Sequence, residues 1–286
     1  MAEEAPPDIL FTDIPSVFAR LANLAKDEDT LVVGDVSPSS FRALEAERDR
    51  RCQHFRLFYQ PDTECVVVTV PNLQHSQMHI IMYEFIRDTM VTMGVHRGWR
   101  PIGDTTFNTA NGSSGQGDSA GSPKAGRNAD DWPTLVVEAG FSQTLPSLRA
   151  KMRWWFAASH HRVKVVILIK MQLTQETLHI EKWLEMVGRP GATATRSATR
   201  SATRAGLAVL QPICNQAIDL EWTGPRPIRQ TPAQGRLPHL FRVTGGPLVI
   251  EFADIFLRAP AAGEHDIVIS DQNLQLYASE IWEDLL

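Results

Sequence analysis

Residues 132–169 decide the fold, and their sequence is WPTLVVEAGFSQTLPSLRAKMRWWFAASHHRVKVVILI. A short apolar run at 134–139, closed by a glycine, is typical of a buried strand. Apolar residues then recur at helical spacing over 145–158, and the β-branched run 163–169 predicts the next strand. A strand, a crossover helix and a second strand form one unit of an α/β sheet.

One acid, Glu138, stands inside the first of these strands. Because a buried charge without a partner is costly, this residue requires an explanation. Two interpretations are open. Glu138 is a ligand of a metal ion, or it is a structural acid paired with Arg149 or Arg153 on the following helix.

The 286-residue chain has the composition of a globular protein, with 43% hydrophobic and 21% charged residues. Its formal net charge of −5 argues against a general polyanion-binding surface but allows a local basic groove. The three cysteines have no CxxC or zinc-ligand spacing and fit a reducing compartment. No apolar run reaches the roughly 20 residues that span a bilayer, and a signal-peptide pattern is absent. We therefore expect an intracellular protein, cytoplasmic or nuclear, without a membrane partner.

The first 60 residues are expected to be an embellishment of one α/β domain that continues over 61–286. Patterns in the first third of the chain predict a helix at 15–26, a strand at 31–34, a surface helix at 38–51, a hairpin of 55–59 with 65–70, and a large helix at 71–94. His75 and His79 are four residues apart on that large helix, a spacing found in metal sites. The HExxH pattern is absent, however, so a partly exposed helix face is the simpler interpretation.

Residues 108–131 are rich in Gly, Ser, Asn and Asp and predict a mobile, turn-rich surface loop. The segment GSSGQGDS within it lacks the phosphate-binding pattern GxxxxGK[ST], so a nucleotide loop is excluded. A sharper alternative is that this loop delivers Asp118 to the strand that carries Glu138. Trp154 and Trp155 could stack on nucleic-acid bases, but adjacent tryptophans on an amphipathic helix usually pack against neighbouring elements.

The second half of the chain contains a predicted strand at 177–183, whose alternation of apolar and polar residues suggests a sheet edge. The unit SATR occurs twice in succession within 191–206, and we expect a disordered insertion at about 188–206. A basic arm that touches nucleic acid is the alternative there. A last helix is predicted over 271–286.

Residues 65–183 and 245–283 resemble a group of fungal proteins. The segments that carry the resemblance include WPTLVVEAG, RWWF and GGPLVIEFADIFLRAPAAGEHDIVIS. That group is distantly similar to the small restriction-endonuclease-like proteins abundant in cyanobacteria, within the PD-(D/E)XK nuclease-like superfamily. The resemblance implies an α/β/α core with a mixed central sheet.

The resemblance also implies a metal site. In the superfamily, acids on two neighbouring strands bind a divalent ion, and a lysine two residues after the second acid orients or deprotonates water. These acids fall on Asp118 and Glu138, with Mg²⁺ or Mn²⁺ as the expected cofactor. Gly140 stands in the position of the lysine, so Lys151 or Arg149 on the following helix would have to supply the cation.

Two functions of different classes follow. The first is a metal-dependent nuclease acting on DNA or RNA, with His75 as a further catalytic candidate. It predicts that Asp118 and Glu138 lie within ~5 Å of each other, near a lysine. The second is a catalytically inactive nuclease-like fold that serves as a binding or interaction module, which the missing lysine and the negative net charge favour. Hydrolysis of a smaller phosphate ester is a third, weaker option; the oligomeric state is left open.

Overall fold

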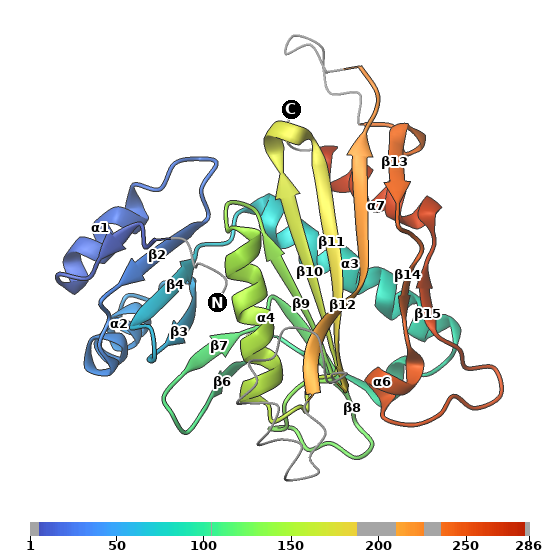
Figure 1. The fold of residues 1–286 in the computed structure, drawn as a ribbon, viewed down its shortest axis with the longest axis horizontal. Helices are drawn as coiled ribbons and strands as arrows, with labels where there is room; N and C mark the ends of the chain where they lie inside the picture. Colours follow the sequence, from blue (N-terminus) through green and yellow to red (C-terminus); the bar gives the residue numbers. More distant parts are fainter. Residues whose placement is uncertain (1–5, 104, 188–209, 226–235, 284–286) are drawn as a thin grey trace, which may run out of the picture.

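The computed structural model describes residues 6–103, 105–187, 210–225 and 236–283. Its elements stack in layers: two N-terminal helices, a small sheet, a single helix, a large sheet and a second pair of helices (Figure 1). Hydrophobic clusters of described residues fill the space between successive layers. The single helix is therefore enclosed between two sheets.

The small sheet has the strand order β1-β2-β4-β3-β7-β6. Its elements and the two helices that cover it are β1 (Ile9–Leu10), α1 (Ile14–Ala22), β2 (Thr30–Gly34), α2 (Pro38–Arg50), β3 (Arg56–Gln60), β4 (Cys65–Thr69), β6 (Thr106–Asn108) and β7 (Ser114–Gln116). Strands β3 and β4 form the predicted hairpin. Helices α1 and α2 cover one face, and Phe58 and Val67 on the other face pack towards the enclosed helix. Residues 6–70 are called the N-terminal unit below; the division of the chain at residue 60 stays a prediction.

The large sheet has the order β13-β12-β11-β10-β9-β8-β5. Its strands are β5 (Trp99–Ile102), β8 (Ser119–Pro123), β9 (Leu135–Gly140), β10 (Val165–Gln172), β11 (Thr177–Val187), β12 (Leu210–Trp222) and β13 (Phe241–Thr244). Strands β9 and β10 are parallel, and all other neighbours in this sheet are antiparallel. A parallel pair needs a crossover connection, and the helix between β9 and β10 supplies it.

Helices cover both faces of the large sheet. The enclosed helix α4 (Leu145–Ala158) lies on one face, as predicted, and α3 (Leu73–Thr92) and α7 (Asp271–Glu283) lie on the other (Figure 1). The predicted α/β/α class with a mixed central sheet is confirmed. The remaining elements are η1 (His96–Gly98), η2 (Leu173–Gln175), η3 (Pro238–Leu240), β14 (Leu248–Ile250), α6 (Phe252–Phe256) and β15 (Ile267–Ile269).

The prediction that 177–183 is an edge strand is wrong. Strand β11 lies between β10 and β12, and β12 pairs with it along its whole length. The polar residues that suggested an edge have protein partners instead: His179 contacts Asp219 on β12, and Glu181 binds Arg149 on α4. The polar residues of this alternation therefore lie on a face of β11 where they form ion pairs with neighbouring elements.

The prediction of a mobile surface loop at 108–131 is also wrong. This segment contains β7 and β8, and Asp118 within it is buried. Its small residues allow aromatic rings to approach the backbone: a Cβ on Gly121 would lie 2.4 Å from the indole nitrogen of Trp99. The paucity of large side chains here therefore reflects close packing.

The predicted insertion at 188–206 and residues 284–286 of the predicted last helix lie outside the described residues. Among the helices that the structure describes, none is long and apolar enough to cross a membrane.

Substitution of Gly121 by alanine is expected to reduce the free energy of unfolding by about 2 kcal/mol, since overpacked cores lose roughly 1–3 kcal/mol. The added methyl group would collide with Trp99, whose indole N–H donates to the Tyr83 hydroxyl at 2.8 Å. Gly98→Ala is the control, because a Cβ there meets nothing within 4 Å. Urea unfolding of both variants checks the prediction, and equal losses in the two would contradict it.

Candidate functional site

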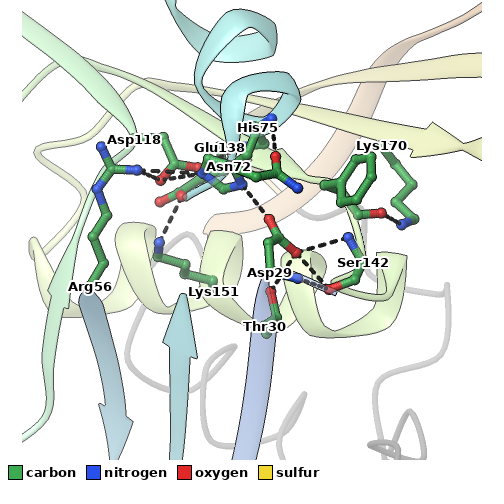
Figure 2. Close-up of polar contacts among 12 residues, drawn as sticks. Asp29, Thr30, Arg56, Asn72, His75, Asp118, Glu138, Ser142, Lys151 and Lys170 are labelled. Carbon is green, nitrogen blue, oxygen red and sulfur yellow. Dashed lines mark hydrogen bonds and ion pairs between the residues drawn. The ribbon is translucent and has the colours of Figure 1, made fainter. Parts of the chain in front are cut away.

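Asp118 and Glu138 lie side by side on neighbouring strands (Figure 2). Strands β8 and β9 pair with Ser119 opposite Val137, so the residue before Ser119 lies across from the residue after Val137. Asp118 also accepts a hydrogen bond from the backbone N–H of Ala139 at 2.7 Å. Both acids are buried, with 6% and 0% of their surfaces exposed. Strand pairing thus brings together the two acids that the sequence predicted as a pair.

Two side chains of α4 hold the Glu138 carboxylate. Lys151 Nζ donates to Glu138 Oε2 at 2.7 Å, and Trp155 Nε1 donates to Oε1 at 2.5 Å. Residues four apart share one face of a helix, so both donors point to the sheet. The alternative pairing of Glu138 with Arg149 is wrong, because that guanidinium binds Glu181.

Close packing explains why Gly140 carries no side chain. A Cβ at this position would lie 2.6 Å from Leu148 Cδ1, since the first turns of α4 rest directly on the end of β9. A side chain at residue 140 would have to displace Leu148 from its packed position. The cation near Glu138 comes from the helix instead.

Arg56 and His75 hold the Asp118 carboxylate. Arg56 Nη1, from the start of β3, lies 2.6 Å from Asp118 Oδ1, and His75 Nε2 lies 3.3 Å from the same oxygen (Figure 2). His75 sits in the first turn of α3, where Asn72 caps the helix by accepting from the His75 N–H at 2.8 Å. The N-terminal unit and α3 thus both reach the acid pair.

Asp29 connects this cluster to the loop after β9. His75 Nδ1 lies 2.8 Å from Asp29 Oδ2, and Asp29 Oδ1 accepts from the Ser142 N–H at 2.9 Å and from its hydroxyl at 2.5 Å. Asp29 and His75 are 0% and 1% exposed. Three acids and three basic side chains form what we call the carboxylate network: Asp29, Asp118, Glu138, Arg56, His75 and Lys151.

Burial and neighbouring charges shift the pKa values in opposite directions. Burial raises the pKa of Glu138 to about 7, against the opposing effect of the Lys151 ammonium. Burial alone would raise the pKa of Asp118, but the charge and hydrogen bond of His75, together with the charges of Lys151 and Arg56, outweigh it and hold that pKa well below its usual range. For His75, burial lowers the pKa, but Asp118 and Asp29 outweigh this effect and raise it to about 9. His75 therefore carries a positive charge at neutral pH.

All four predicted site residues, Asp118, Glu138, Lys151 and His75, belong to the carboxylate network. Their catalytic and metal-binding roles stay predictions. Asp29 and Arg56 were missed, because neither lies in a motif or at a regular spacing from the others. Lys151 is 6% exposed, so it is a buried lysine and does not lie on the solvated surface of the helix. Trp154 and Trp155 are buried against Trp132 and each other, as the packing interpretation expected.

The carboxylates of Asp118 and Glu138 are suitable ligands for a divalent ion. The side chains around them are cationic, however, and do not favour a second positive charge. Carboxylate oxygens are the ligands that Mg²⁺ and Mn²⁺ prefer. Each of the four carboxylate oxygens of Asp118 and Glu138, however, already accepts from a protein N–H group. Within the described ranges, no group of three or more His, Cys, Asp or Glu side chains has metal-binding geometry. An ion between the two acids would compete with the protein cations, of which Lys151 comes from α4, His75 from α3 and Arg56 from the small sheet.

A second charged cluster lies on β11 and is distinct from the carboxylate network. Glu181 binds Arg149, His179 at 3.1 Å and the indole N–H of Trp183 at 2.8 Å. Burial alone would raise the pKa of Glu181, but these hydrogen bonds outweigh it and lower the pKa to about 2. This cluster ties α4 to the centre of the large sheet.

No protein family matches the sequence, and no curated protein is significantly similar to it. Among solved structures, the chain is similar to a protein from Anabaena variabilis described as a "putative nuclease belonging to DUF820". The two share 11% sequence identity with a TM-score of 0.37, over 78% of this chain and 90% of the other. The strand order and helix positions given above, rather than this match, define the fold.

Asp29→Ala is expected to lower the free energy of unfolding by about 3 kcal/mol or more, because it leaves His75 as a buried charge with one partner fewer. Ser142→Ala removes one hydroxyl but keeps the backbone N–H bond to Asp29, so a loss of about 1 kcal/mol is expected. Urea unfolding at neutral pH compares the two variants. A loss in Asp29→Ala no larger than that in Ser142→Ala would show that the contact with His75 contributes little.

Glu181→Gln is expected to weaken the dependence of stability on acid pH. Because the folded pKa of about 2 lies below the ordinary value of 4.5, Glu181 stabilises the protein above pH 4.5, and this contribution is lost as the pH falls towards 2. The variant should be less stable than the wild type at neutral pH, and the difference should shrink through that window. Thermal melting across that pH range measures it; a constant difference would contradict the assignment.

Proposed function

We propose that this chain is a nuclease-like phosphodiester hydrolase whose reaction centre consists of Asp118, Glu138 and Lys151. The observation that carries the proposal is the 2.7 Å contact between Lys151 Nζ and Glu138 Oε2. Through it, helix α4 supplies the cation that Gly140 leaves out, beside two acids on adjacent strands. The substrate class is nucleic acid, DNA or RNA.

Each residue has a distinct task in this proposal. Asp118 and Glu138 would hold Mg²⁺ or Mn²⁺, which when bound lowers the pKa of water and neutralises charge on the phosphate. Lys151 places an ammonium group next to Glu138, where it can orient water or hold a proton. The indole N–H of Trp155 fixes the Glu138 carboxylate, and His75 fixes Asp118.

A second function is favoured by a specific observation. In the carboxylate network the acids are matched by an equal number of cationic side chains, and its acid pair is at most 6% exposed. Such a closed, charge-balanced network can serve as a structural anchor. The protein would then be a catalytically inactive nuclease-like fold that acts as a binding or interaction module.

Cleavage of supercoiled plasmid, single-stranded DNA and RNA with Mg²⁺ or Mn²⁺ tests the proposal. The wild type should cleave, and Glu138→Gln should lose at least about 10- to 100-fold of the rate, the range seen when mere supports of metal ligands are removed. Glu181→Gln is the matched control, because it neutralises another buried acid of the large sheet outside the centre. Cleavage retained in Glu138→Gln would reject the centre, and absence of cleavage and of metal binding in the wild type would favour the inactive module.

A further inference from the structure

The N-terminal unit covers the acid pair by contacts from one end of its sheet. Thr30 of β2 and Arg56 of β3 both pair with Thr69 of the intervening strand β4, so Asp29 and Arg56 project from the same sheet end. Figure 2 shows these two side chains reaching the carboxylate network from below, one to Asp118 and one to His75. Because one sheet carries both residues, they approach or leave the network together.

The apolar contact behind these polar contacts is incomplete. A cavity of about 190 Å³ lies between the N-terminal sheet and the start of α4, with Val32, Phe58 and Val67 on the sheet side and Ser147 and Ala150 on the helix side. Unfilled space forfeits dispersion contacts on both walls. Beside this cavity the unit is held by Phe58, which contacts Trp154 edge-on, and by the pairing of Tyr59 with Ser114 of β7. Arg56 and Asp29 supply the polar contacts at this end of the sheet.

We propose that the N-terminal unit is an autoinhibitory cover and that Arg56 is its plug, occupying the cation position on Asp118 that a divalent ion must take. This inference rests on the proposed function, because it concerns access to the same centre. The Arg56 guanidinium and a divalent ion repel each other and compete for one carboxylate. Removal of Arg56 alone would leave the buried Asp118 with His75 as its remaining ion-pair partner among the described residues, so exchange of one cation for the other is the favourable route.

The proposal couples metal binding to undocking. When the ion replaces Arg56, the start of β3 moves away, and the bonds from Asp29 to His75 and Ser142 are released with it. The same movement exposes Glu138 and Lys151, which otherwise have 0% and 6% of their surfaces accessible. Metal and substrate thus gain access through one opening.

Terbium luminescence excited through tryptophan measures the exchange directly. Tb³⁺ is a hard cation that takes oxygen ligands, and Trp155 is hydrogen-bonded to Glu138, so an ion at the centre has its sensitiser in place. Arg56→Gln should bind Tb³⁺ about tenfold tighter than the wild type or more, within the range of coupled binding equilibria. Arg42→Gln is the matched control, since it removes an exposed arginine of α2 from the same unit. Glu138→Gln should abolish the signal.

The outcomes separate the two proposals. Tighter binding in Arg56→Gln, with Arg42→Gln like the wild type, supports the plug. Equal affinity in wild type and Arg56→Gln, lost in both when Glu138→Gln is added, overturns the plug and leaves the proposed centre standing. Absence of any Glu138-dependent signal in all variants removes the centre itself, and the plug falls with it.

A measurement on the wild type guards against a variant that fails to fold. Hydrogen exchange with and without saturating Mn²⁺ should show faster exchange at β2, β3 and the Ser142 N–H in the presence of the ion. The amides of β9 and β10 should stay protected, because they lie in the large sheet. Exchange in β2 and β3 that does not change while Mn²⁺ binds would overturn the cover.

Discussion

The fully buried carboxylate of Glu138 is the constraint on which the surrounding structure depends. A carboxylate in the middle of a central strand has no access to water, so its hydrogen-bonding and charge requirements must be met by neighbouring elements. Helix α4 meets them with Lys151 and Trp155. Asp118 on the adjacent strand is a second buried acid. Its carboxylate contacts two further cations, His75 from α3 and Arg56 from the N-terminal unit. Most layers of the molecule therefore contribute a side chain to one buried network.

A catalytic role and a structural role place opposite demands on a buried network of carboxylates. A reaction centre needs carboxylates that exchange partners, whereas an anchor needs carboxylates whose partners stay. Asp118 and Glu138 differ in this respect. The hydrogen bonds from Lys151 and Trp155 to the Glu138 carboxylate come from α4, which is part of the core, and the ion pair of Arg56 with Asp118 comes from a separate sheet. In the proposed opening, Arg56 is the partner that exchanges, and the two functional interpretations differ in whether that exchange occurs.

Much of the fold could be predicted from hydrophobic patterns within short stretches of the sequence. The helix at 145–158 and the hairpin of β3 and β4 follow from patterns within a few residues, and the acid pair follows from a resemblance of continuous motifs. Contacts over long separations left no such pattern: Arg56 meets Asp118 across 62 residues, and His75 meets Asp29 across 46. Strand β12 was missed for a similar reason, because its polar residues have partners on β11 that only the folded sheet supplies. The glycines of this segment were misjudged because Gly121 admits the ring of Trp99 and Gly115 that of Trp154.

The close approach of Leu148 to Gly140 connects the bare end of β9 to the position of the ammonium group near Glu138. An ammonium group on the strand requires room that the first turns of α4 occupy, while an ammonium group on the helix allows those turns to rest on the strand. Any side chain at residue 140 would require Leu148 to change position. The helix that covers Gly140 is also the helix that carries Lys151, so the packing of α4 on β9 and the ion pair with Glu138 form as one unit.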